Sequence, residues 1–205
     1  MSPCHRPPSS ERSGADAVGT ASTSGVDGTD VLVRPSRRPR SIPVLLHAPT
    51  SLALSDLTDL TREIADEVLA GVHPVEVDPV RRWYELLRTD DYVDVWLISW
   101  STEQAAELHD HAGSLGALTV VSGELVEHRW AGAGLRSRRL LAGHSAGFPL
   151  GHVHDVGNHE TTPAVSVHAY SPPLTAMSYY DVDPARGLRR TRSELIGSGS
   201  PKGVG

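Results

Sequence analysis

Apolar residues along this chain recur with two different periods, and the first is the period of a helix. Between Ser55 and Gly71 they return every three or four positions, at Leu57, Leu60, Ile64, Val68 and Leu69. This spacing predicts an amphipathic helix that Ser55 can cap and Gly71 can end. A second, short helix is predicted from Asp78-Pro79, because proline fits a first helical turn and apolar side chains follow on one side, at Val80, Trp83, Tyr84 and Leu87.

From Tyr92 onward the period changes to two, which is the period of a strand. Val93, Val95 and Leu97, with the flanking Trp96 and Trp100, predict the first strand. Turn signals separate further short strands at residues 122–123, 131–134, 143, 157–158 and 171–173. The pattern therefore predicts a mainly β protein, a barrel with N-terminal helices packed outside it.

Both ends of the chain lack this patterning. Residues 1–42 are rich in Ser, Pro, Gly, Thr and Arg and have no periodic apolar positions, so they cannot bury enough surface to offset chain entropy. We expect a disordered leader there and a single folded domain over residues 43–185. Residues 186–205 are rich in Arg, Gly and Ser, and we expect a flexible tail.

Composition excludes several classes of partner. A chain of 205 residues with 39% hydrophobic content is long enough for one barrel-sized core. Its net charge of -6 argues against nucleic-acid binding, and it has no apolar run long enough to cross a membrane. Cys4 is its only cysteine, so no intrachain disulfide forms, and no signal-peptide pattern precedes the domain. We expect a cytosolic monomer.

Three histidines carry the strongest chemical signal. His109 and His111 are two residues apart, so on an extended strand both imidazoles point the same way and can bind one ion. His154, from a distant strand, can supply a third nitrogen. His152 is the open alternative, because it forms a second same-face pair with His154.

The spacing around these histidines resembles the two motifs of the cupin family, small barrels of the double-stranded β-helix or jelly-roll type. After His109-x-His111 come four residues, Gly116, six residues and Gly123. The second motif is complete, with Gly143, Pro149, Gly151, His154 and Asn158 at the family's intervals.

The first motif departs from the family pattern at two positions. Glu103 stands where a leading Gly is usual, and Gly116 stands where cupins have a metal-binding Glu. Three neutral imidazoles would leave an iron-group ion with its full charge and about three open positions, which suits an anionic chelating substrate together with O2.

Residues 164–173 resemble the signature of the cysteine dioxygenases, cupins that bind iron with three His and convert a thiol and O2 to a sulfinic acid. The resemblance extends from about Pro43 to Asp181. It implies iron(II) held by His109, His111 and His154, a small thiol amino acid or thiol carboxylate with O2 as substrates, and a relay in which Ser166 fixes the tautomer of His168 and His168 orients Tyr170. These three residues alternate along one strand, so they share one face. A purely structural hydrogen-bond network is the alternative.

The family also implies a side chain that binds the substrate carboxylate. Cysteine dioxygenases use an Arg before the first barrel strands, and mercaptopropionate dioxygenases use a Gln. The aligned position falls at Glu85 or Leu86, neither of which can do this. Arg82 is our candidate, with Arg81 and Arg88 as further possibilities, and a solvated helix charge is the alternative. The segment contains no Gln, which disfavours the mercaptopropionate dioxygenases.

The leading hypothesis is an iron(II)-dependent dioxygenase that converts L-cysteine and O2 to cysteine sulfinic acid. Within the same class, 3-mercaptopropionate or another small thiol carboxylate is an alternative substrate. A non-catalytic cupin that binds a metal or ligand is the alternative of another class, and the Ser166, His168 and Tyr170 set argues against it. A metal-dependent isomerase or hydrolase would more often use a carboxylate ligand, which Gly116 does not provide.

Overall fold

The computed structural model describes residues 50–196, all of which belong to the unit that spans Leu45–Gly205. They form one helix, α1 (Leu54–Leu69), and eleven strands. The strands are β1 (Tyr84–Thr89), β2 (Asp94–Trp100), β3 (His109–Asp110), β4 (Leu115–Ser122), β5 (Glu124–Trp130), β6 (Leu135–Leu141), β7 (Ser145–Phe148), β8 (His154–Gly157), β9 (Ala164–Ser171), β10 (Ala176–Asp183) and β11 (Gly187–Leu195).

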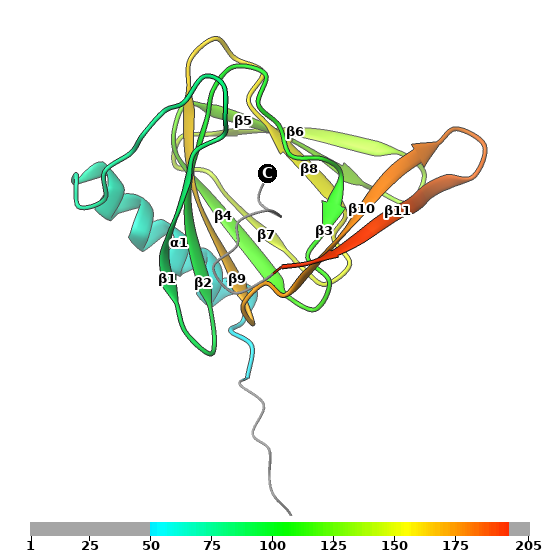
Figure 1. The fold of residues 1–205 in the computed structure, drawn as a ribbon, viewed down its shortest axis with the longest axis horizontal. Coiled ribbons are helices and arrows are strands. Elements are labelled where there is room, and N and C mark those ends of the chain that lie inside the picture. Colours follow the sequence, from blue (N-terminus) through cyan, green and yellow to red (C-terminus); the bar gives the residue numbers. More distant parts are fainter. Residues whose placement is uncertain (1–49, 197–205) are drawn as a thin grey trace, which may run out of the picture. The chain divides into compact units, whose positions relative to one another are not determined.

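The strands form two antiparallel sheets that face each other around a common interior (Figure 1). One sheet has the order β1-β2-β9-β4-β7, and the other has the order β11-β10-β3-β8-β5-β6. Strands that are distant in sequence are thus neighbours, as in β2 beside β9 and β5 beside β8. This mainly β, two-sheet barrel has the cupin fold that the sequence predicts.

Helix α1 lies against the outer face of the first sheet (Figure 1). Leu57 and Val68 are buried there against Val95 and Val167. The helix begins one residue before the predicted cap, because the Asp56 carboxylate accepts the N–H of Ala53 at 3.3 Å. The first predicted helix is therefore confirmed, and the apolar stripe that predicted it is its buried face.

The second predicted helix was wrong, because its residues form a turn followed by strand β1. Asp78 Oδ1 accepts the N–H groups of Val80 and Arg81 at 2.7 and 3.1 Å, which closes a turn that does not continue as a helix. From Tyr84 onward the chain pairs with β2. Tyr84 packs in the interior, whereas Leu87 packs on the side of α1. Tyr84 and Leu87, whose spacing fits a helix, therefore lie on opposite faces of a strand.

Strands β2 and β9 have buried apolar residues on both faces, because α1 packs on one face and the barrel interior lies on the other. In β2, Val95 and Leu97 face α1, while Trp96, Ile98 and Trp100 face the interior. In β9, Val165, Val167 and Ala169 join the α1 side, and Tyr170 joins the interior. The polar residues of β9 therefore project into the barrel.

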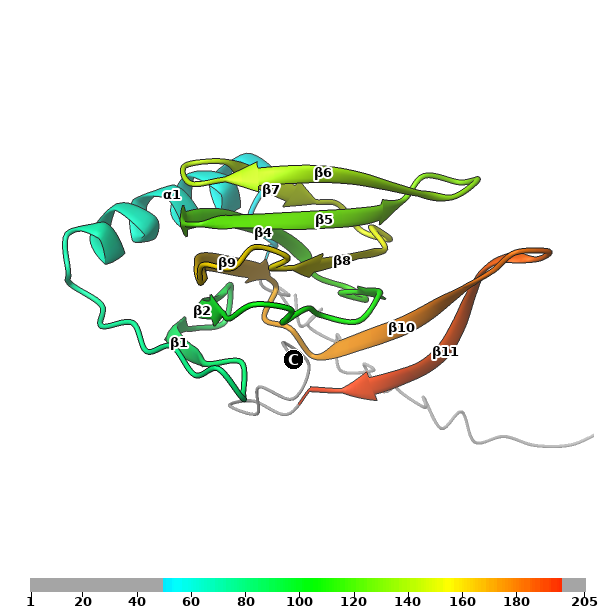
Figure 2. The same cartoon turned by 90° about the horizontal axis from the view of Figure 1, so that it is seen from above.

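The expected flexible tail was wrong over residues 187–195, which form β11 and pair with β10 along the whole strand. The hairpin extends away from the other strands (Figure 2). Its arginines suit an exposed edge because they find partners: Arg192 binds Glu107 at 2.6 Å and covers the ring of Tyr179 at 3.6 Å. The expected leader at residues 1–42 lies outside the described residues. Within residues 50–196, no helix has the length and apolar character needed to span a bilayer.

Candidate metal centre

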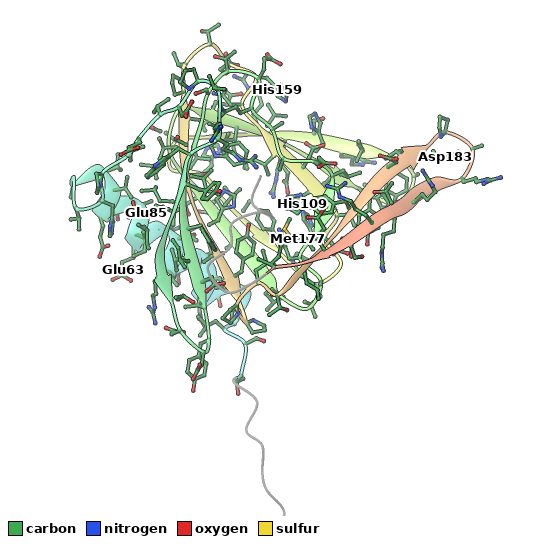
Figure 3. All side chains as sticks on the ribbon, in the orientation of Figure 1. Glu63, Glu85, His109, His159, Met177 and Asp183 are labelled. Atoms are coloured by element: carbon green, nitrogen blue, oxygen red, sulfur yellow. The ribbon has the colours of Figure 1, made fainter. Side chains whose placement is uncertain are left out.

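The structure brings His109, His111 and His154 together inside the barrel. Strands β3 and β8 pair so that His109 lies directly opposite His154, and His111 follows β3 on the same side as His109. The ring centroids are 4.9 to 5.2 Å apart, and the Nε2 atoms of His109 and His111 are 3.2 Å apart. All three side chains are buried, and Figure 3 shows His109 among the interior side chains.

Hydrogen bonds of the Nδ1 atoms of His109 and His154 determine which nitrogen of each ring keeps a free lone pair. His109 Nδ1 donates to the carbonyl oxygen of Glu107 at 2.6 Å, and His154 Nδ1 donates to Glu127 Oε1 at 3.0 Å. A neutral imidazole has one N–H, so each Nε2 carries a lone pair. His154 Nε2 is buried and has no hydrogen-bond partner among the described residues. The ligand atoms of the three histidines lie within 4.8 Å of one another, and this grouping together with the unpaired His154 Nε2 fits a metal ion.

Burial keeps these rings neutral. It lowers the pKa of His109 to about 3 and lowers the pKa of His111 and His154 as well, because an imidazolium loses its hydration inside the barrel. Neutral imidazole is the form that binds metals.

Gly116 is closely packed by aromatic rings and offers no ligand atom of its own. A Cβ at this position would lie 3.0 Å from Phe148 Cδ2 and 3.1 Å from Tyr170 Cδ1. In the part of the chain that the structure describes, the cluster that contains His109 and His111 includes no carboxylate. His152 does not join it either, since its Nε2 lies 2.9 Å from Glu127 Oε1.

Ser166, His168 and Tyr170 form the expected line, and Trp100 extends it. Trp100 Nε1 donates to Ser166 Oγ at 2.9 Å, Ser166 Oγ lies 2.9 Å from His168 Nε2, and His168 Nδ1 lies 3.3 Å from Tyr170 Oη. Ser166 is fully buried, and among the described residues the side-chain partners of its hydroxyl are Trp100 Nε1 and His168 Nε2. When Ser166 donates to His168 Nε2, the His168 proton lies on Nδ1 and is directed at Tyr170, and the phenol can then direct its own proton at a third group.

A small cavity of about 20 Å³, measured as the space open to the centre of a water molecule, adjoins this line and the histidines. It is lined by Trp100, Ala106, His109, His154, Val156, His168 and Tyr170. Its walls are thus largely aromatic and apolar, with the inner nitrogens and the phenol as the polar groups. Apolar walls with a few convergent polar groups are typical of sites for small ligands.

Arg82 lies against Trp100, which lines this cavity, and is not itself a lining residue. Its guanidinium is 4.5 Å from the centroid of the Trp100 ring, and within residues 50–196 its buried Nε and Nη1 have no hydrogen-bond partner. Burial lowers the pKa of Arg82 to about 10, so it stays charged at neutral pH. Arg81 is exposed, and Arg88 binds Asp90 at 2.7 Å.

Sequence reasoning missed the roles of Trp100 and Glu127. Trp100 was identified only as part of a strand, although it is an even number of residues from Trp96 and Ile98 and so shares their interior face. Glu127 is two residues after Leu125 in β5, so both side chains are on one face, and both are fully buried. A carboxylate at an apolar position of a strand was the signal that could have found it.

Comparison with known proteins places this site in a family. The model of the family described as cysteine dioxygenase type I matches residues 72–183, which include every site residue named above. One similar solved structure is an uncharacterized conserved protein with a double-stranded β-helix domain from Klebsiella pneumoniae subsp. pneumoniae MGH 78578, with 17% identity, a TM-score of 0.43, and coverage of 69% of this chain and 96% of that chain. Another is a cupin superfamily protein from Desulfitobacterium hafniense DCB-2, with 12% identity, a TM-score of 0.42, and coverage of 47% and 83%. No curated protein matches the chain.

Proposed function

Because the chain belongs to the cysteine dioxygenase type I family, we propose that it is an iron(II)-dependent thiol dioxygenase that oxidises L-cysteine with O2 to cysteine sulfinic acid. The observation that carries the proposal is the buried set of His109, His111 and His154, which lie together with no carboxylate from the described part of the chain in the same cluster. A set of this kind leaves room on the ion for two reactants.

The Nε2 atoms of His109, His111 and His154 would hold the ion, because neutral imidazole nitrogens are suitable ligands for it. When bound, ferrous ion supplies a Lewis acid that favours the thiolate and a redox partner that activates O2. Zinc can occupy three imidazoles equally well, but it has no redox chemistry. This difference is why we propose iron.

The chain's own residues would orient the substrate and control a proton. Arg82 has two buried nitrogens without a partner among residues 50–196, and their N–H groups suit a substrate carboxylate. Burial raises the pKa of Tyr170, so its phenol stays protonated and can donate a hydrogen bond into the cavity. Trp100, through Ser166 and His168, would hold that donor in place, because the four side chains form one continuous line of hydrogen-bonding contacts.

A second substrate, 3-mercaptopropionate, is favoured by the cavity walls. None of the residues that line the cavity is acidic, so none of them can form an ion pair with the ammonium group of cysteine. The smaller thiol carboxylate needs no such partner, and Arg82 would bind its carboxylate in the same way.

Oxygen consumption by the iron-loaded protein tests the proposal. We expect uptake of O2 with L-cysteine or 3-mercaptopropionate, formation of the matching sulfinic acid, and no uptake with the metal-free protein or with a thiol that lacks a carboxylate. The ratio of kcat/KM for the two thiols identifies the substrate. If the iron-loaded protein consumes no O2 with any small thiol, the non-catalytic cupin is the better description.

A further inference from the structure

Glu127 is a charged side chain at the centre of the barrel wall that the proposed reaction does not use. It is fully buried. Its Oε1 accepts hydrogen bonds from His154 Nδ1 at 3.0 Å and from His152 Nε2 at 2.9 Å. Its Oε2 binds the guanidinium of Arg138, on the neighbouring strand β6.

These contacts make the cluster a hydrogen-bond network and not a second metal site. Glu127, His152 and His154 are close enough to hold an ion. However, the Arg138 cation already binds the carboxylate, and a divalent ion there would face that positive charge. Both histidines also direct an N–H at Oε1, which leaves them no lone pair on that side.

We propose that Glu127 is a positioning residue, which holds His154 with Nε2 turned toward the metal and places a negative charge behind this ligand. A carboxylate that accepts from the far nitrogen of a histidine fixes the ring's tautomer and orientation and raises its basicity. The inference rests on the proposed metal centre, but it does not depend on which thiol is oxidised.

His152 and Arg138 hold this carboxylate in one position. His152 stacks on Phe148, with ring centroids 5.3 Å apart, and it donates to the same oxygen as His154. Arg138 holds the second oxygen from a partly exposed position, since its side chain is 41% accessible. The negative charge behind His154 is therefore only partly balanced, because the cation that balances it is hydrated.

Glu124 provides a matched control on the same strand. It lies three residues before Glu127 in β5, and it also binds an arginine of β6, Arg139. In the part of the chain that the structure describes, the hydrogen bonds of its side chain go to Arg139 and to no histidine. Replacing either glutamate by Gln thus removes one β5–β6 ion pair, but only the Glu127 change reaches a proposed ligand.

Titration of the metal-free protein with cobalt(II), followed by visible absorption in competition with a chelator, tests the inference without thiol or O2. We expect Glu127→Gln to weaken cobalt binding roughly 10- to 100-fold and to alter the absorption bands, while Glu124→Gln changes the dissociation constant by less than about 2-fold. Equal losses in the two variants, or cobalt binding by Glu127→Gln as tight as in the wild type, would overturn the inference.

Arg138→Gln keeps the test decisive if Glu127→Gln does not fold, as judged by circular dichroism. This change leaves the carboxylate on His154 and removes its counter-charge, so we expect cobalt affinity equal to or above that of the wild type. A loss of affinity in Arg138→Gln as large as about 10-fold contradicts the inference. Failure of the wild type to bind cobalt would overturn the metal centre itself, whereas a wild type that binds cobalt but consumes no O2 overturns only the dioxygenase proposal.

Discussion

At the scale of single residues, Arg82 combines a charge with buried donors. Two of its nitrogens are buried and have no hydrogen-bond partner among the residues that the structure describes, and the guanidinium lies 4.5 Å from the centroid of the Trp100 ring. A buried charged donor without an acceptor is costly, and an anionic ligand would remove that cost. This burial supports Arg82 as the proposed carboxylate-binding group, over the alternative of a solvated charge.

We predict that Arg82→Met lowers kcat/KM for the preferred thiol carboxylate roughly 10- to 100-fold, mostly through a higher KM, because one charge-assisted contact is lost. Steady-state oxygen consumption measures this effect. Arg88→Met is the matched control, since Arg88 lies in the same segment and pairs with Asp90 at the surface, and it should keep the wild-type value. An unchanged KM in Arg82→Met would assign the carboxylate to another residue.

The two departures from the cupin motif also have explanations at this scale. Gly116 is confined by Phe148 and Tyr170, so the space of a ligand side chain is filled by aromatic rings. Glu103 has φ of 64°, the left-handed conformation for which the family's Gly is suited. The chain thus keeps the backbone of the motif at residue 103 while it accepts a strained side chain.

At the scale of elements, α1 acts on the site through strand β9. The helix covers Val165, Val167 and Ala169 on the outer face of β9, and Ser166, His168 and Tyr170 occupy the inner face of the same strand. Thr61 of the helix also bonds Thr119 of β4 at 2.8 Å, inside the contact. The position of the relay therefore depends on a helix that does not touch it.

We predict that Leu57→Ala lowers the free energy of unfolding by roughly 2–5 kcal/mol, because Leu57 is fully buried between α1 and the sheet. Urea denaturation measures the change. Leu69→Ala, in the last turn of the same helix, should cost less than about 1 kcal/mol because Leu69 is 66% exposed. Similar losses at both positions would mean that the helix is not packed as described.

At the scale of the whole molecule, the barrel keeps four neutral histidines in its interior. Burial lowers the pKa of His109 and of His168 to about 3, and it lowers the pKa of His111 and His154. In the unfolded chain these groups titrate near a pKa of about 6.5. Below that pH the unfolded chain binds protons that the folded protein does not.

We therefore predict that the metal-free protein loses stability as the pH falls from 7 to 5, with a slope that approaches about 1.4 kcal/mol per pH unit for each such histidine. The stabilisation is complete above the unfolded pKa and declines as the pH falls toward the folded values. Urea unfolding at half-unit steps of pH measures the slope. A free energy of unfolding that stays constant over this range would contradict the buried neutral cluster.

The cytosolic location and the monomeric state stay predictions.

Much of the site could be predicted from the sequence because its signals are local. The His109-x-His111 pair, the alternation of Ser166, His168 and Tyr170, and the apolar stripe of α1 each depend only on the period of an extended or helical chain. The structure brings these residues together as expected, and their roles as ligands and relay stay a proposal.

The tertiary structure decided what depends on partners distant in the chain. Pairing with β2 made residues 84–89 a strand and not a helix, and pairing with β10 ordered residues 187–195. The burial of Glu127 against His154 and the contact of Arg82 with Trp100 arise only when separate strands close into a barrel. Periodicity fixes which face a side chain is on, but strand pairing fixes what that face meets, and the free energies of pairing and burial come from residues that are not neighbours in sequence.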